Sequence, residues 1–140
     1  MTRNSRVKKS QPDSTQSSGH AKILLVDDSR AVLTLHQLLL GSGEYDLVFA
    51  KNGREAVEKA TAEKPDLIFM DVVMPEMDGF QAVRALRAQD VTKTTPIIMV
   101  TTRGEDQNEK EGYAAGCNGY VHKPLKGSEL IEKLRSFLGE

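Results

Sequence analysis

Short apolar runs recur along the chain, separated by longer segments in which apolar residues return every three or four positions. Four runs are wholly apolar, at residues 23–26, 47–50, 67–70 and 97–100, and a fifth, less apolar segment lies at 119–122. Continuous apolar runs of this length, bounded by turn-forming residues, are typical of strands buried on both faces, as in a parallel sheet. We therefore predict five strands.

Helical periodicity fills the intervals between these runs. We expect one helix capped by Ser29 and stopped by Gly41-Ser42-Gly43, one over residues 54–63, and one that begins at Asp78-Gly79. A polar helix is expected over 105–115, with only Tyr113, Ala114 and Ala115 to bury, followed by an amphipathic last helix. The expected apolar stripes are Val32, Leu33, Leu35, Leu39 and Leu40; Ala56, Val57 and Ala60; Phe80, Val83 and Leu86; and Leu130, Ile131, Leu134, Phe137 and Leu138.

This alternation of strands and helices predicts an α/β fold, a doubly wound parallel sheet of five strands with five helices. The common strand order is 2-1-3-4-5, in which the first and third strands are neighbours. Asp27 and Asp28 follow the first strand, and Asp71 follows the third. We expect these acids to converge at one crevice, bordered by Thr101 and Lys123 from the ends of the fourth and fifth strands.

Three carboxylates in one small site repel one another unless a cation joins them. An all-oxygen cluster suits a hard ion such as Mg²⁺, which takes one or two carboxylates and keeps several waters. A carboxylate can also attack phosphorus to form an aspartyl-phosphate, and phosphoryl transfer needs mainly neutralisation of charge. A metal, the Lys123 ammonium and the Thr101 hydroxyl would supply that neutralisation around Asp71.

Each of these residues also has a structural interpretation that the sequence leaves open. Asp27 and Asp28 could cap a helix, and Asp71 could be an ordinary acid at a strand end. Thr101 alone is more often a strand-end residue, and Lys123 alone a solvated charge. His36 and His122 have no metal-ligand partner nearby and are expected to be structural or exposed, and Cys117, without a Cys or His neighbour in the sequence, is not expected to be a nucleophile.

The composition of the chain limits the number of domains, the disulfides and the kinds of partner that can be expected. The chain has 140 residues, a formal net charge of -1 and a single cysteine, Cys117, so it predicts one domain without disulfides and no global field toward nucleic acid or membrane. Residues 1–20 are basic and rich in Ser, Thr and Gln, which is typical of a disordered tail; residues 21–140 form the domain. No apolar stretch approaches membrane-spanning length, so a cytoplasmic protein is expected.

Four motifs in order give the chain a specific resemblance. They are residues 25–29 (Leu-Val-Asp-Asp-Ser), 70–79 (Met-Asp-Val-Val-Met-Pro-Glu-Met-Asp-Gly), Val100-Thr101, and 119–124 (Gly-Tyr-Val-His-Lys-Pro). Across residues 22–138 the chain resembles a response-regulator receiver domain of two-component signalling, especially the single-domain chemotaxis type. The resemblance implies a flavodoxin-like, CheY-like fold and a phosphorylation site.

The resemblance implies a role for each matching residue. Asp71 corresponds to the phosphorylated aspartate, which receives phosphate from a sensor histidine kinase, a phosphotransfer protein or a small phosphodonor. Asp28 corresponds to a direct Mg²⁺ ligand, Asp27 to one that acts more often through water, and the backbone carbonyl of Val73 to the third protein ligand. Lys123 corresponds to the lysine that pairs with the carboxylate and then with phosphate.

The same resemblance implies a switch. Thr101 corresponds to the hydroxyl that moves to the phosphoryl oxygen, and Tyr120 to the aromatic residue that turns inward behind it. Phosphorylation would shift the population of the face formed by the fourth helix, fifth strand and last helix, and that face would dock a downstream protein. Lys123-Pro124 corresponds to a peptide bond that is cis in the family.

Departures from the family pattern lead to two hypotheses. Thr102 stands where alanine or glycine is usual, which bears on how freely a phosphodonor reaches Asp71. The fourth helix has few large apolar residues and is expected to order on phosphorylation or partner binding. Val73 cannot hydrogen-bond an attacking water and Arg103 can lean over the phosphoryl group, so slow self-hydrolysis is expected.

Three alternative functions fit the sequence less well than a receiver domain does. A haloacid-dehalogenase-type phosphatase would need an acid where Val73 stands, and a flavin or nucleotide module would need a phosphate-binding loop instead of Asp27-Asp28-Ser29. A pseudo-receiver, an interaction module that is not phosphorylated, is the main alternative. We expect a monomeric signalling protein rather than an enzyme acting on other substrates. Because the sequence ends at Glu140, soon after the last helix, we expect no DNA-binding domain.

Overall fold

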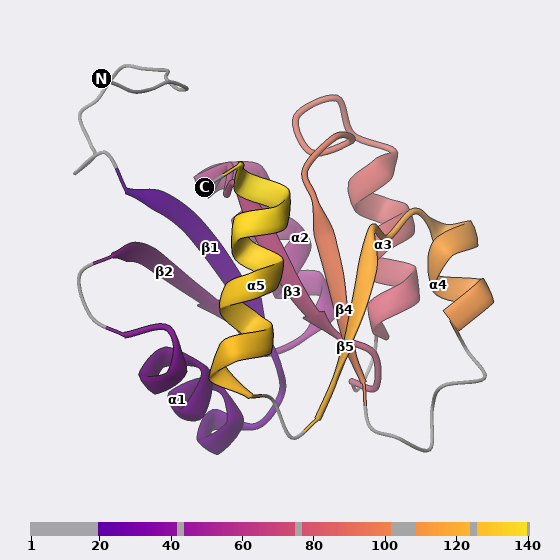
Figure 1. Cartoon of the computed structure of the whole chain (residues 1–140). Helices are drawn as coiled ribbons and strands as arrows, with labels where there is room; N and C mark the ends of the chain where they lie inside the picture. Colours follow the sequence, from indigo (N-terminus) through magenta and orange to yellow (C-terminus); the bar gives the residue numbers. More distant parts are fainter. Residues whose placement is uncertain (1–19, 42–43, 75–76, 102–108, 124–125, 140) are drawn as a thin grey trace.

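The computed structural model describes residues 20–41, 44–74, 77–101, 109–123 and 126–139. Several sequence-based predictions fall outside these residues: the tail up to residue 19, the helix stop at Ser42 and Gly43, residues 105–108 of the fourth helix, and Thr102, Arg103 and Pro124. In the described residues strands and helices alternate throughout (Figure 1). They are β1 (Ala21–Val26), α1 (Arg30–Leu39), β2 (Tyr45–Ala50), α2 (Gly53–Glu63), β3 (Leu67–Asp71), α3 (Gly79–Arg87), β4 (Ile97–Thr101), α4 (Glu109–Ala115), β5 (Gly119–His122) and α5 (Gly127–Leu138).

The strands form one parallel sheet in the order β2-β1-β3-β4-β5, which confirms the predicted fold class and topology. β1 pairs with both β2 and β3, so the winding direction reverses at the junction of β1 and β3. Val26 lies opposite Met70, and Met70 opposite Met99. The carboxyl ends of these strands therefore finish at one edge of the sheet.

Apolar side chains alternate between the two faces of the sheet and build two core layers. In β3, Ile68 and Met70 pack toward α2, α3 and α4, whereas Leu67 and Phe69 pack toward α1 and α5. All five residues of β3 are buried, as are those of β4. Burying one such large side chain stabilises the fold by about 1.5–3 kcal/mol, so helices must cover both faces.

Short polar side chains start the helices where the sequence predicts. The Ser29 hydroxyl accepts a hydrogen bond from the Val32 N–H at 3.2 Å, and Asp78 forms a capping box with Gln81 at the start of α3. The next residue, Gly79, donates its N–H to the carbonyl of Val72 at 2.8 Å. A Cβ at Gly79 would overlap the backbone oxygen of Asp71, so only glycine lets α3 begin this close to the end of β3.

Two helices differ from the expected burial. In α1, Leu35 was expected on the buried stripe but is 43% exposed, while His36 is 2% exposed, because the helix turns the His36 side toward the sheet. In α4, Tyr113 and Ala114 were expected to be buried, but both are exposed, and Gly112 and Ala115 face the core. A helix of seven residues buries one narrow stripe, here positions three apart, so its neighbours point outward.

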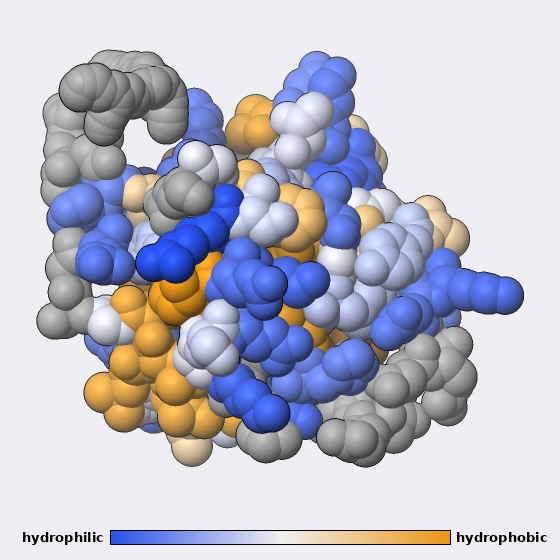
Figure 2. Space-filling view, in the orientation of Figure 1, coloured by the Kyte–Doolittle hydropathy of each residue, from blue (hydrophilic) through white to orange (hydrophobic). Residues whose placement is uncertain are grey.

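Hydrophilic residues cover most of the face shown in Figure 2, with an apolar patch over α1. Leu38, three positions after Leu35 on the same side of α1, is 72% exposed. None of the described helices has both the length and the apolar content that crossing a bilayer requires.

Arg87 at the end of α3 ties three segments together. Its guanidinium donates to the carbonyl of Gly116 at 2.9 Å, to the carbonyl of Thr92 at 3.0 Å and to Oδ1 of Asn118 at 2.8 Å. Asn118 Oδ1 also accepts the N–H of Ile97, so the same group joins the start of β4. Burial lowers the pKa of Arg87. The carbonyl of Thr92 also accepts the N–H of Thr95 at 3.1 Å, so among the described residues the carbonyl of Gly116 is the acceptor that depends most on Arg87.

We predict that Arg87→Ala lowers the free energy of unfolding by roughly 2–3 kcal/mol, because charge-assisted hydrogen bonds are lost and their acceptors stay partly buried. Arg84→Ala is the matched control on the same helix. Among the described residues the Arg84 guanidinium pairs with Glu111 on the surface at 3.2 Å, so a loss below about 1 kcal/mol is expected. Urea unfolding of both variants measures the two free energies of unfolding. Equal decreases in the two variants would contradict a stabilising role of the Arg87 hydrogen bonds.

Candidate acidic site

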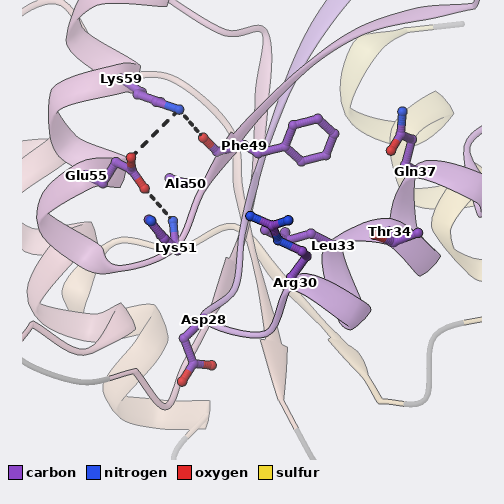
Figure 3. A pocket seen from close by; sticks show the side chains of 10 residues that line it. All are labelled: Asp28, Arg30, Leu33, Thr34, Gln37, Phe49, Ala50, Lys51, Glu55 and Lys59. Carbon is purple, nitrogen blue, oxygen red and sulfur yellow. Dashed lines mark hydrogen bonds and ion pairs between the residues drawn. The ribbon is translucent and has the colours of Figure 1, made fainter.

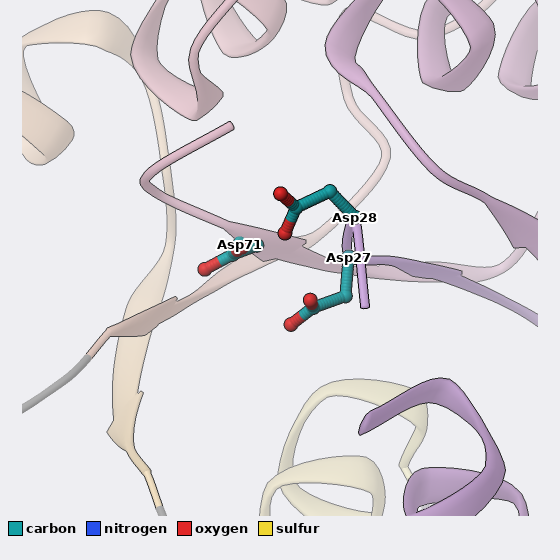
Figure 4. A group of neighbouring side chains, drawn as sticks. All are labelled: Asp27, Asp28 and Asp71. Carbon is teal, nitrogen blue, oxygen red and sulfur yellow. The ribbon is translucent and has the colours of Figure 1, made fainter. Parts of the chain in front are cut away.

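Three aspartates meet at the carboxyl edge of the sheet, as predicted. Asp27 and Asp28 follow β1, and Asp71 is the last residue of β3. One carboxylate oxygen from each lies within 4.8 Å of the others. Figure 4 shows the three side chains directed to the same side of the strand ends. Asp27 and Asp71 are buried, at 1% and 4% exposure, whereas Asp28 is exposed.

The local turn explains why Asp27 is a site residue and not a helix cap. Its backbone N–H bonds to the carbonyl of Ala50 at 3.1 Å, which continues the pairing with β2. Its Oδ1 accepts the N–H of Ser29 at 2.9 Å, and Ser29 itself caps α1. The capping interpretation of Asp27 and Asp28 is therefore wrong, because Ser29 performs that role and leaves Oδ2 of Asp27 directed at the site.

Lys123 supplies the cation of the site. Its Nζ lies 2.8 Å from Oδ2 of Asp27 and donates to Oδ1 of Asp71 at 3.3 Å. Its backbone N–H bonds to the carbonyl of Thr101 at 2.7 Å, which fixes the end of β5 beside β4. The side chain is only 21% exposed, so the interpretation of Lys123 as a solvated surface charge is wrong.

Burial and crowding shift the ionisation of these groups. Burial, and after it the nearby Asp27 carboxylate, raise the pKa of Asp71 to about 6, although attraction to Lys123 partly opposes the shift. Burial works against the charge of Lys123, but its contacts with Asp27 and Asp71 outweigh that effect and raise its pKa. The site therefore holds a charged lysine beside an unusually basic aspartate.

The remaining predicted site residues lie on the same edge or next to it. Thr101 ends β4 and is fully buried, and Tyr120 in β5 is 8% exposed. Val73 lies two residues after Asp71, and its side chain is 59% exposed. The role of the Val73 carbonyl as a metal ligand stays a prediction. His36 is buried, and Cys117 is 7% exposed with its pKa raised by burial to about 11, which disfavours the thiolate form of Cys117.

The donor set fits a hard divalent cation. Three carboxylates face one ammonium in the described residues of the site, which leaves an excess of two negative charges. All the acidic donors are oxygen atoms, and the exposed Asp28 leaves one side of the cluster open to water. Mg²⁺ prefers oxygen ligands and retained water, so Asp27, Asp28 and Asp71 could hold it.

A cleft of about 340 Å³ opens on the other side of Asp28, between α1, the end of β2 and α2 (Figure 3). Sequence reasoning did not find it, because it is lined by residues from three separate elements. Some of its polar groups already contact one another: Glu55 accepts the backbone N–H of Lys51, and Lys59 reaches both Glu55 and the carbonyl of Phe49. Asp27, Asp71 and Lys123 do not line this cleft, so the acidic cluster is the better candidate site.

Comparison with known proteins agrees with this geometry. The family model described as the response regulator receiver domain matches residues 23–135. The chain is 38% identical over 117 residues to the alkaline phosphatase synthesis transcriptional regulatory protein PhoP of Bacillus subtilis, covering 84% of this chain and 48% of that protein. It is 36% identical to the transcriptional regulatory protein ResD of the same organism, covering 86% and 49%. The chain thus spans about half the length of these curated relatives.

Solved structures give the same result. The chemotaxis protein CheY4 of Vibrio cholerae superposes with a TM-score of 0.79 at 38% identity, covering 85% of this chain and 99% of that one. The receiver domain of the sensor histidine kinase PA1611 of Pseudomonas aeruginosa has a TM-score of 0.80 at 33% identity, covering 87% and 100%. In that crystal structure a magnesium ion is coordinated in the active-site cleft.

We predict that Asp71→Asn stabilises the metal-free protein at pH 7. The pKa of Asp71 is about 6 in the folded state against an ordinary 3.8, so the ionised carboxylate opposes folding above pH 6. The gain should be on the order of 2 kcal/mol at pH 7 and should shrink as the pH falls from about 6 toward 3.8, where Asp71 itself is protonated.

Urea unfolding at several pH values, with a chelator present, measures this gain. Asp90→Asn is the control, because the Asp90 side chain is 96% exposed and lies away from the site. A stabilisation by Asp71→Asn that is the same at pH 4.5 and pH 7 would contradict the assigned cause.

Proposed function

Because the chain belongs to the response regulator receiver domain family of two-component systems, we propose that Asp71 is its phosphoacceptor. One observation supports this above the others: a buried aspartate, less acidic than usual, lies beside two further carboxylates and the ammonium of Lys123. A structural acid at a strand end would need neither the extra carboxylates nor the lysine. This arrangement is suited to a nucleophile on which negative charge accumulates.

In the proposed reaction, a carboxylate oxygen of Asp71 attacks the phosphorus of a phosphohistidine or of a small acyl phosphate. A bond forms between that oxygen and phosphorus, while the bond from phosphorus to the donor nitrogen or oxygen breaks and the donor keeps the electron pair. Lys123 stays in place because Asp27 holds it at 2.8 Å, and its ammonium is available to the phosphoryl oxygens. The Thr101 hydroxyl is proposed to contact one of those oxygens.

The carboxylates of Asp27, Asp28 and Asp71 are proposed to hold Mg²⁺, with the carbonyl of Val73 as a further ligand. When bound, the ion supplies positive charge against the equatorial oxygens of the transferred phosphoryl group. The exposure of Asp28 supports its role at the open side of the site, where retained waters are needed. The buried Asp27 bridges the turn after β1 and Lys123, which suits a contact through water.

The proposed partners follow from this chemistry. A sensor histidine kinase or phosphotransfer protein would donate the phosphoryl group, and a downstream protein would read the face of α4, β5 and α5. The chain would then be a signalling protein that catalyses only its own phosphorylation and dephosphorylation. The relatives PhoP and ResD are named transcriptional regulatory proteins and are about twice as long as the matched region, so the expected lack of a DNA-binding domain and the expected monomer stay predictions.

We expect the protein to gain one phosphate on incubation with Mg²⁺ and acetyl phosphate, as measured by intact mass. Asp71→Ala or addition of a chelator should abolish the gain, and Asp90→Asn should leave it unchanged. No gain in the wild type would favour a pseudo-receiver, unless Thr102→Ala restores labelling. Restoration would instead show that Thr102 limits access of the phosphodonor.

Magnesium binding provides an independent check. Asp28→Asn should weaken Mg²⁺ affinity by roughly tenfold or more, because one of few anionic ligands is lost. Binding by the wild type should also weaken as the pH falls through about 6, where Asp71 takes up a proton. Titration calorimetry of wild type, Asp28→Asn and the control Asp90→Asn tests this. An affinity unaffected by Asp28→Asn would exclude Asp28 as a ligand.

A further inference from the structure

The Tyr120 ring is buried between β5 and α4. The side chain is 8% exposed and belongs to the same core layer as Phe80 and Met99. Its ring centroid lies 5.4 Å from that of Tyr113, at an interplanar angle of 54°. The hydroxyl donates a long hydrogen bond of 3.4 Å to the carbonyl of Glu109, so the end of the ring reaches the backbone of α4.

The space for this ring depends on a missing side chain in α4. A Cβ at Gly112 would overlap the Tyr120 hydroxyl oxygen, lie 2.8 Å from Cζ of the same ring and 3.1 Å from Cε1 of Phe80. Glycine within a helix costs about 0.5–1 kcal/mol relative to alanine, and α4 is short. Helix propensity therefore opposes a glycine at this position, and the contact with Tyr120 explains it.

The backbones of α4 and β5 are both held by hydrogen bonds. Neither can easily move to relieve an overlap between a Cβ at position 112 and the Tyr120 ring. The carbonyl of Gly112 accepts the N–H of Cys117 at 3.0 Å, and the carbonyl of Tyr113 accepts the N–H of Gly116 at 3.1 Å. This is the Schellman pattern, with Gly116 at a φ of +119°. Arg87 also holds the carbonyl of Gly116, and on the other side Tyr120 is paired with Met99 in the sheet.

We propose that Gly112 is the positioning residue that allows Tyr120 to lie buried, and that a methyl group at position 112 turns the ring out toward solvent. Of the groups that meet at this point, the backbones of α4 and β5 are held by hydrogen bonds and Phe80 is packed in the core. The tyrosine side chain is the group that can leave, by rotating about χ1. Gly112 thus sets the balance between the buried and exposed positions of the ring.

The functional consequence rests on the proposed function, in which Tyr120 is part of the phosphorylation switch. If phosphorylation favours the buried ring, then a residue that favours the buried ring must also favour phosphorylation, because the coupling is reciprocal. Gly112 would then keep the unphosphorylated chain close to its responsive conformation. Replacing Gly112 by alanine should weaken the response without touching Asp71.

The test uses the full chain labelled with 3-fluorotyrosine, because it contains only three tyrosines, Tyr45, Tyr113 and Tyr120. Single Tyr→Phe variants assign the three fluorine resonances. In Gly112→Ala, the Tyr120 resonance should gain the solvent isotope shift of an exposed ring, between H₂O and D₂O, while the Tyr45 resonance stays unchanged. Gly127→Ala is the matched control, because a Cβ there meets only Cδ2 of Leu39 at an ordinary 3.6 Å. A Tyr120 resonance that stays as protected in Gly112→Ala as in the wild type would overturn the proposal.

A second measurement separates this proposal from the proposed function. The apparent affinity for beryllofluoride with Mg²⁺, a stable analogue of the phosphoryl group, should fall several-fold in Gly112→Ala and not in Gly127→Ala. An exposed ring with unchanged beryllofluoride affinity would support the role of Gly112 and count against Tyr120 as the switch. Absence of beryllofluoride binding in the wild type would count against the proposed function alone, because the fluorine test needs no phosphoryl analogue.

Poor folding of Gly112→Ala would be resolved by removing the ring. In a Tyr120→Ala background, Gly112→Ala should raise the melting temperature, since alanine favours the helix once the overlap is gone, whereas in the wild type it should lower it. Thermal unfolding of the four proteins gives this comparison. A melting temperature that Gly112→Ala lowers equally in both backgrounds would show that the glycine serves the helix itself and would overturn the proposal.

Discussion

Two carboxylates held out of water at the end of a parallel sheet are the constraint on which the rest of the site depends. Asp27 and Asp71 come from neighbouring strands, so the β1–β3 junction brings their charges together whatever the surrounding loops do. Burial and mutual repulsion make ionised Asp71 unfavourable. Lys123 relieves part of this cost, and it reaches the site from β5, at the far end of the strand order. The residual negative charge is what makes the site suited to attract a cation.

Several contacts around the site serve to keep this geometry fixed. Ser29 caps α1 while its N–H holds Asp27, so one turn starts a helix and orients a carboxylate. Gly79 lets α3 begin directly against the backbone of Asp71. Farther away, Arg87 joins the ends of α3 and α4 to the start of β5. The Asp71 carboxylate is positioned by backbone packing more than by its own few side-chain contacts.

Much of the fold could be predicted because its pattern is strong. The continuous apolar runs in β1, β3 and β4 require cover on both faces, and alternation with helices then leaves few topologies. The stripes of α1 and α4 were harder to predict. Leu35 and Tyr113 are exposed while His36 and Gly112 are buried, because a helix rotates to suit the surface it packs on and because polar or side-chain-free residues carry no hydrophobic signal. The Arg87 contacts were not predicted either, since they join residues about thirty positions apart.

The sequence by itself determined the fold class, the strand order and the set of acids, hydroxyl and lysine at the strand ends, since these follow from periodicity and from the rule that ligands bind at the carboxyl edge. It left open whether Asp27 caps a helix and whether Lys123 is a surface charge. Only the tertiary structure decided these points, because burial, the 2.8 Å contact of Lys123 with Asp27 and the raised pKa of Asp71 arise when distant segments meet. The fit of Tyr120 against Gly112 was likewise decided only by the tertiary structure. A glycine has no side chain that could indicate its role in the sequence, and the role becomes visible only when the neighbouring ring is in place.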